Sequence, residues 1–198
     1  TELFVWAGKT FAPDGNVTLE SGGSGDARDG RLYIAPAAQF TAAGTESPSI
    51  GGGLYVGSGA VFTSANSSVT FTATTTGKSI SAAQALSFYG LTFNGAGGGW
   101  NLDSGSGIAT TTVTNAFDMA AGTLGGQGDL IVSQGNVTGS GTITMLGGTV
   151  RINGTGNFGG AADWQFRNLI LGSGSGSLTT TRTGAGTTTV SGVLTIAP

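Results

Sequence analysis

One stretch of the chain is written twice, and this repetition limits the folds that the chain can adopt. Residues 88–120 begin with "FYGLTF" and end with "TTTVTNAFDMA", and from Phe166 the chain begins again with "FRNLIL" and ends with "GTTTVSGVLTIA". Phe88 aligns with Phe166, an offset of 78, and Thr110 aligns with Thr187, an offset of 77. A fixed period of this kind is the sequence mark of an array or solenoid.

A shorter echo gives the size of one coil. Leu32-Tyr33-Ile34 is followed by "FTAAGTES", and Leu54-Tyr55-Val56 is followed by "FTSANSS", so the offset is 22. One coil of a β-solenoid takes roughly 20 to 25 residues. The echo therefore predicts one coil for each copy.

The composition and the short apolar patterns predict strands and oppose helices. Gly accounts for 39 of the 198 residues, and it interrupts nearly every window long enough for a helix. Runs such as "SVTFTAT" and "WQFRNLILG" place large apolar residues at every second position, which is the period of a strand with one buried face. We predict an all-β fold, a parallel β-helix (β-solenoid) with a right-handed winding. Tandem β-sandwich modules are the alternative, because Gly-rich turns at regular spacing suit both folds.

The charged residues are concentrated near the start of the chain. Residues 1–31 carry eight of the 17 charged side chains, and the terminal repeats of solenoids are atypical because one face must meet water. We therefore predict an N-terminal capping or joining segment at 1–31 and the β-solenoid at 32–198. Within the solenoid we expect repeat units at about 54–129 and 130–198.

The residues that are missing exclude several functions. The chain has no His and no Cys, and its net charge is −3, so a basic nucleic-acid surface is not expected. No apolar run approaches the roughly 20 residues of a membrane span. Hydrolysis would have to rest on carboxylates alone, and Asp103, Asp118, Asp129 and Asp163 are thinly spread. We expect no enzymatic activity.

Two further ligand classes have candidate residues. The segment "GGSGDARDG" at 22–30 approaches the calcium-binding nonapeptide of β-rolls. Asp26 and Asp29 are therefore candidate ligands of a single weak calcium site, although we favour a solvated turn. No other cofactor is expected. A sugar-stacking strip is the second possibility, since aromatic rings offer apolar faces with a polar edge. Its candidates are Trp6, Trp100, Trp164, Tyr33, Tyr55 and Tyr89.

The stretch "FTSANSSVTFTATTTGKSISAAQALSFYGLTFNGAGGGWNL", followed by "TTTVTNAFDMAAGTL", resembles a repeat of very large bacterial surface proteins. In that family the repeats run "GTFTAG…VTF…G…I…FYNLTF" and then "TVTGNLTLAAGTL". The resemblance covers residues 54–198, and it departs from the pattern where "FRNLIL" replaces "FYGLTF". It implies an extracellular β-solenoid or β-rich stalk of an adhesin-like protein, without catalytic residues.

These observations predict a structural protein outside the cell or on its surface, either a self-assembling fibre subunit or a rigid stalk module of an adhesin. The alternative is a carbohydrate- or surface-binding β-helix domain, whose partners would be glycans or a cell surface. An open solenoid end offers unpaired backbone groups to another chain, so we expect copies to join end to end. The predicted joining residues are Leu3, Phe4, Val5, Trp6, Val193, Leu194, Thr195 and Ile196.

Overall fold

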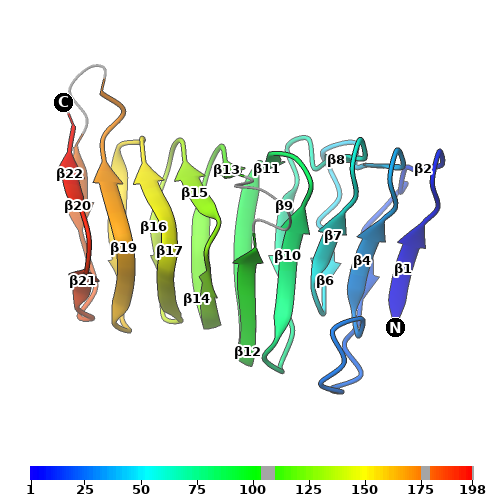
Figure 1. Cartoon of the computed structure of the whole chain (residues 1–198), viewed down its shortest axis with the longest axis horizontal. Coiled ribbons are helices and arrows are strands. Elements are labelled where there is room, and N and C mark those ends of the chain that lie inside the picture. The colour runs from blue at the N-terminus through cyan, green and yellow to red at the C-terminus, as the bar shows by residue number, and fades with distance from the viewer. Residues whose placement is uncertain (104–109, 175–178, 198) are drawn as a thin grey trace.

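The computed structural model describes residues 1–103, 110–174 and 179–197. Every regular element in these ranges is a β-strand, and the paired strands run parallel. Figure 1 shows them stacked along one long axis, with the two termini at opposite ends. The predicted β-solenoid is therefore confirmed, and the sandwich alternative is wrong because sandwiches are built from antiparallel sheets. The handedness of the winding stays a prediction.

The chain visits three faces in turn, and each face is a stack of parallel strands. Face 1 contains β1 (Glu2–Val5), β4 (Arg31–Ile34), β7 (Leu54–Val56), β10 (Lys78–Ala82) and β21 (Thr188–Val190). Face 2 contains β2 (Thr10–Phe11), β5 (Gln39–Thr41), β8 (Val61–Thr63), β11 (Leu86–Phe88), β13 (Thr110–Val113), β15 (Asp129–Val132) and β22 (Leu194–Ile196). Face 3 contains β3 (Thr18–Leu19), β6 (Ser49–Ile50), β9 (Ser68–Phe71), β16 (Val137–Gly139), β18 (Gly156–Gly160) and β20 (Thr180–Arg182).

Four longer strands bend around corners and contribute to two faces each. β12 (Gly90–Asp103) and β14 (Phe117–Gly126) run from face 3 into face 1. β17 (Thr142–Ile152) and β19 (Trp164–Leu171) run from face 1 into face 2. Hydrogen bonding is continuous through most of the stack, but β2, β5 and β8 form a separate three-stranded sheet. No helix in the described ranges is long and apolar enough to cross a membrane.

The register gives the length of each turn directly. Leu32 pairs with Leu54 and Tyr33 with Tyr55, which confirms the coil length predicted from the shorter echo. A later turn is shorter, because Leu124 already pairs with Ile143. The first turn is the longest, because a loop at residues 20–30 lies between β3 and β4. Loop length therefore varies while the stacked strands keep their register.

The two copies of the longer repeat lie on different faces. "FYGLTF" turns from face 2 to face 3, where Leu91 pairs with Val69 and Phe117. "FRNLIL" turns from face 1 to face 2, where Leu169 pairs with Val150. All corners join one half-buried strand to the next, so the same local pattern suits any of them. The similarity of the two segments therefore reflects the fact that each forms a corner between two faces. The predicted repeat units at 54–129 and 130–198 stay a prediction from the sequence.

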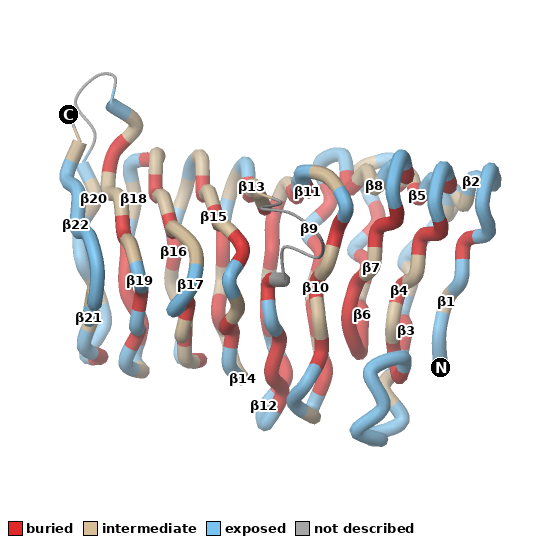
Figure 2. The backbone as a smooth tube through the Cα atoms, in the orientation of Figure 1, coloured by how far each residue is buried: buried red, intermediate tan, exposed pale blue. Residues whose placement is uncertain are grey.

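The core is a set of inward-facing columns, one residue per turn, running along the axis. Along many strands in the middle of the stack, buried positions alternate with intermediate or exposed ones (Figure 2). Trp100 and Trp164 occupy the same column with Leu124 and Ile143 between them, and both are at most 1% exposed. The Trp100 indole N–H donates to the Gly52 carbonyl at 3.0 Å, and that of Trp164 donates to a glycine carbonyl at 2.9 Å. Each large ring is therefore buried next to glycine with its polar atom satisfied.

Candidate assembly surfaces

The first turn presents one edge that has no partner strand among the described residues. β1 pairs with β4, β2 with β5 and β3 with β6, each on one side only. Figure 1 shows β1 as the outermost strand at the N-terminal end. Unpaired strand edges offer a row of N–H and C=O groups to another strand. The predicted joining residues 3–6 lie at this edge.

Side chains of β1 divide between the core and the outside. Val5 is buried and Leu3 is half-buried, while Phe4 and Trp6 are 38% and 71% exposed. The Phe4 ring stacks on Tyr33 at 4.5 Å, and Tyr33 stacks on Tyr55 at 4.5 Å. The ring centroids of Trp6 and Phe4 are 4.7 Å apart, and the two ring planes are tilted by 51°. The outer surface near this end is therefore an aromatic ladder that runs along the axis.

The last turn also has an unpaired edge among the described residues, and it leaves the core uncovered. β20 pairs with β18, and β21 and β22 pair with β19, again on one side. Leu194 and Ile196 continue the core columns of Leu169 and Leu171, yet they are 54% and 77% exposed. They are exposed because no described residue lies over them.

A cavity opens into this uncovered core. It measures about 560 Å³, and its apolar lining includes Phe158, Leu169, Leu171, Val190 and Leu194. Val193 is 61% exposed and Thr195 is exposed beside it. The predicted residues 193–196 therefore form an apolar surface at the C-terminal end of the stack.

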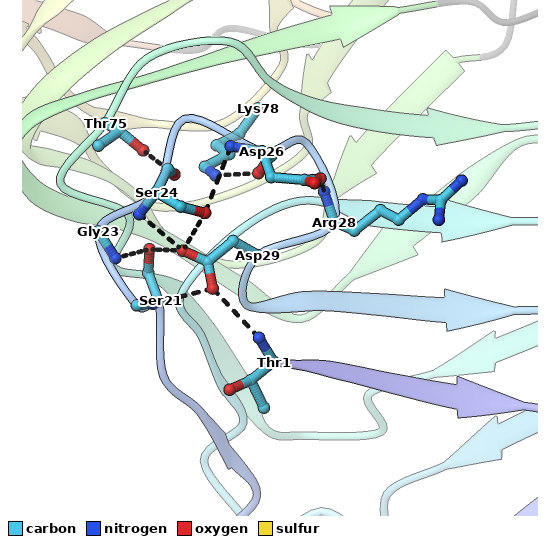
Figure 3. Close-up of polar contacts among 10 residues, drawn as sticks. Thr1, Ser21, Gly23, Ser24, Asp26, Arg28, Asp29, Thr75 and Lys78 are labelled. Carbon is cyan, nitrogen blue, oxygen red and sulfur yellow. Dashed lines mark hydrogen bonds and ion pairs between the residues drawn. The ribbon is translucent and has the colours of Figure 1, made fainter.

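The loop at residues 20–30 is held by the buried carboxylate of Asp29 (Figure 3). Asp29 is 6% exposed. It accepts hydrogen bonds from the backbone N–H groups of Gly22 at 2.8 Å and Ser24 at 3.2 Å. The hydroxyl groups of Ser21 and Ser24 donate at 2.9 and 3.3 Å, and the Thr1 nitrogen lies 3.2 Å away. The Gly22 amide first, and then the Ser21 hydroxyl, hold the pKa of Asp29 well below its ordinary value, although burial acts in the opposite direction.

Lys78 holds the same loop, on the side opposite to Thr1 (Figure 3). Its side chain is fully buried, and its Nζ donates to the Asp26 carbonyl at 2.7 Å. Thr75 Oγ1 adds a hydrogen bond of 3.4 Å to the Ser24 carbonyl. The backbone nearby is packed so closely that a Cβ at Gly52 would lie 2.1 Å from the Asp29 carbonyl oxygen. The loop is therefore tied to residues of later turns, alongside the stack.

The structure brings the two calcium candidates into one loop but does not arrange them as ligands. The Asp29 oxygens are occupied by donors, and Asp26 Oδ1 accepts the Arg28 N–H at 2.7 Å. In the described ranges, no three acidic side chains gather into a group that could hold a metal. Calcium needs six to eight oxygen ligands, several of them from carboxylates. The geometry gives the calcium hypothesis no support.

The carboxylates considered for catalysis are also separated. Asp129 Oδ1 accepts the Thr149 N–H at 2.7 Å, and Asp163 Oδ1 accepts the Thr187 N–H at 2.6 Å. Asp118 lies half-buried on the outer side of face 3, where burial raises its pKa. The side chain of Asp103 lies outside the described part of the chain. The three described carboxylates therefore lie at separate places in the stack, and no two of them are arranged as a catalytic pair.

The two hydrogen bonds of Asp129 and Asp163 belong to a wider pattern that the sequence interpretation missed. An Asp or Asn at a corner accepts the backbone N–H of the following turn, and we call these residues the corner acceptors. They are Asn16, Asp129, Asn136, Asp163 and Asn168. Their signal in the sequence is an Asp or Asn shortly before a strand, at its first residue (Asp129) or at the bend of a long strand (Asn168). They join neighbouring turns through side-chain oxygens, in addition to the strand ladders.

The predicted aromatic strip does not form as a single surface. Trp100 and Trp164 are core residues, so they cannot stack on a sugar. Trp6, Tyr33 and Tyr55 do lie near one another at the first turns, but Tyr33 has rings on two sides. Of this group, Trp6 presents the largest accessible ring.

Comparison of the chain with protein-family models, with curated proteins and with solved structures found no match. The geometry described above is therefore the basis for the functional argument.

Proposed function

We propose that this chain is a structural module, a rigid extracellular solenoid that joins copies of itself end to end as a fibre subunit or as the stalk of a surface adhesin. The proposal assigns the protein a mechanical role and no catalytic one. Its extracellular location rests on the resemblance of residues 54–198 to repeats of bacterial surface proteins. Its partners would be further copies of the chain.

The observation that carries the proposal is the match between the two open ends. Each end presents three strands, one from each face: β1, β2 and β3 at the first turn, and β21, β22 and β20 at the last. The paired strands of the stack run parallel, so a second copy could continue it in the same direction. Covering Leu194 and Ile196 would contribute about 1 to 2 kcal/mol each. Backbone pairing along three strands would add directional bonds.

The polar side chains described above make contacts within the stack, which is consistent with a structural role. The buried charged groups Asp29 and Lys78 hold the loop of the first turn, and the corner acceptors bind backbone N–H groups. A solenoid completes its backbone pairing through neighbouring turns, so its shape follows from the number of turns. We therefore propose that the length of the rod and the contacts made at its two ends determine its function.

Sedimentation velocity and negative-stain electron microscopy of residues 1–198, at rising concentration, test the proposal. We expect rods that lengthen with concentration. The variant Leu194→Lys/Ile196→Lys should remain monomeric, because two ammonium groups would have to be buried in the contact. Leu146→Lys is the matched control, since Leu146 is 55% exposed but lies in β17 within the stack. Monomeric rods of the unchanged chain at every concentration would overturn the proposal.

Carbohydrate binding is the second candidate, and the exposed Trp6 ring beside Phe4 favours it. An indole face of this size can stack on a pyranose ring. A glycan array with the unchanged chain and with Trp6→Ala separates the two functions. Binding that depends on Trp6, in a monomeric protein, would support this candidate in place of end-to-end joining.

A further inference from the structure

Arg182 occupies a position that is apolar in the earlier turns. On face 3 it pairs with Phe158. In the earlier turns, the residues of this column are apolar and point into the core. The other members are Val137, Phe117, Leu91 and Val69. All of these are buried at 3% exposure or less, whereas Arg182 is exposed at the last turn. Its guanidinium donates to the Gly184 carbonyl at 2.8 Å.

A charge in a core column restricts what can cover this end. Burying an unpaired guanidinium is strongly unfavourable, and inward-pointing charges at a sheet edge prevent indiscriminate pairing. An apolar cover would therefore leave the Arg182 charge with the Gly184 carbonyl and no carboxylate. A suitable partner must bring a carboxylate to the place where Arg182 points.

The first turn of a second copy would bring a carboxylate next to the Gly184 end of β20, where the Arg182 guanidinium lies. If the stack continues in register, Arg182 would lie over Val17 of the next copy and Gly184 over Leu19. The reason is that Leu19 belongs to a column that pairs in succession through Ile50, Phe71, Phe93, Met119, Gly139 and Gly160, and Gly184 lies against Gly160. Glu20 follows Leu19 directly and is exposed, and its side chain has no hydrogen bond or ion pair within the described ranges. The Arg182 guanidinium, which lies against Gly184, would then meet Glu20.

The loop that follows Glu20 leaves this edge accessible. The bonds from Lys78 and Thr75 tie the loop to later turns, and Figure 3 shows Ser24 and Asp26 turned toward those two residues. The loop therefore lies alongside the stack, and β3 keeps its free edge.

We propose that β20 of one copy pairs with β3 of the next, and that Arg182 forms an ion pair with Glu20 across this contact. The inference rests on the proposed end-to-end association and adds its register and its specificity. The contact is heterologous, since different surfaces meet, so it leads to an open filament. The ion pair would select this register over a slipped one, because a slip leaves the buried guanidinium without a carboxylate.

Charge exchange tests the proposal. Arg182→Glu and Glu20→Arg should each weaken association by about tenfold or more, as expected for a close interfacial charge pair. The double variant Arg182→Glu/Glu20→Arg should recover most of it, because the pair is restored in reverse. Arg167→Glu, on the exposed outer side of β19, is the control, and it should associate as the unchanged chain does. Sedimentation velocity at two salt concentrations provides the readout.

The possible failures are distinguishable. If the unchanged chain does not associate, the proposed function fails. If it associates and the single variants do so equally well, the ion pair is wrong while the end-to-end role stands. Weak single variants with no recovery in the double variant would also contradict the pairing of these two residues. Circular dichroism confirms that each variant keeps its β-structure.

Discussion

The two ends of this solenoid are built differently, although each presents three strand edges. At the first turn the inward residues Val5 and Leu19 are 4% and 8% exposed, and a loop fixed by Asp29 lies beside them. At the last turn the inward residues Leu194 and Ile196 are more than half exposed. The inward residues of the first turn are therefore largely covered by described residues, while those of the last turn are not. A contact between the two ends, as proposed above, would be heterologous because it joins unlike surfaces.

The largest expected difference between the ends concerns truncation of leucine. Leu19→Ala should lower the free energy of unfolding by about 2 kcal/mol, because a buried side chain is lost. Leu194→Ala should cost less than about 1 kcal/mol in the monomer, because that side chain is already in water. Urea denaturation at low protein concentration measures both. Equal losses would mean that the last turn is covered in solution.

Asp29→Asn tests how firmly the loop of the first turn is held. The variant keeps the shape of the side chain but loses the charge that its donors stabilise, so the loop amides of Gly22 and Ser24 should exchange hydrogen faster. The exchange of amides in β22 should not change. Hydrogen exchange read by NMR separates the two ends. Unchanged protection at Gly22 would show that the carboxylate does not hold the loop.

The same carboxylate predicts the effect of pH on the loop. The folded-state pKa of Asp29 is lowered, so its stabilisation is fully present above the ordinary Asp pKa of about 4. It is lost progressively as pH falls below that value toward the folded-state pKa. Loop protection should therefore be constant from neutral pH to about pH 4 and should decline only in stronger acid. Loss of protection between about pH 7 and about pH 5 would contradict this.

Corner acceptors provide a smaller test at both ends. Asn168 Oδ1 accepts the Val193 N–H at 3.1 Å, and Asn16 Oδ1 accepts the Ser47 N–H at 2.8 Å. Replacing either residue by Ala should cost about 1 kcal/mol, the net value of one hydrogen bond. Asn168→Ala should also loosen β22, which has a partner on one side only. Equal fraying at both ends, seen by hydrogen exchange, would remove this difference.

The smallest effect is expected at Trp6. The ring is 71% exposed, so Trp6→Ala should change the free energy of unfolding by less than about 0.5 kcal/mol. Thermal denaturation checks this value. A larger loss would mean that the aromatic ladder supports the first turn and is more than an exposed surface.

The strand pattern and the coil length were predictable because they are local properties. Alternation of apolar residues in "SVTFTAT" and the shorter echo both appear in the structure, and Leu32 lies beside Leu54 as a result. The same reasoning placed residues 3–6 and 193–196 at the two ends of the stack, where the structure has them; that they join copies stays a prediction. Asp29 was noticed for its charge, but its role was not found, since its donors come from a loop conformation that no short motif specifies.

The sequence by itself determined that this chain stacks short strands joined by small residues at the corners, because alternation and glycine content act over a few residues. Only the tertiary structure decided which face each segment occupies, because the turns differ in length: Glu2 pairs with Arg31, whereas Leu124 pairs with Ile143. The accumulated difference places "FYGLTF" and "FRNLIL" on different faces. The winding also brings Lys78 to the Asp26 carbonyl, a contact between distant parts of the chain that no local pattern could specify.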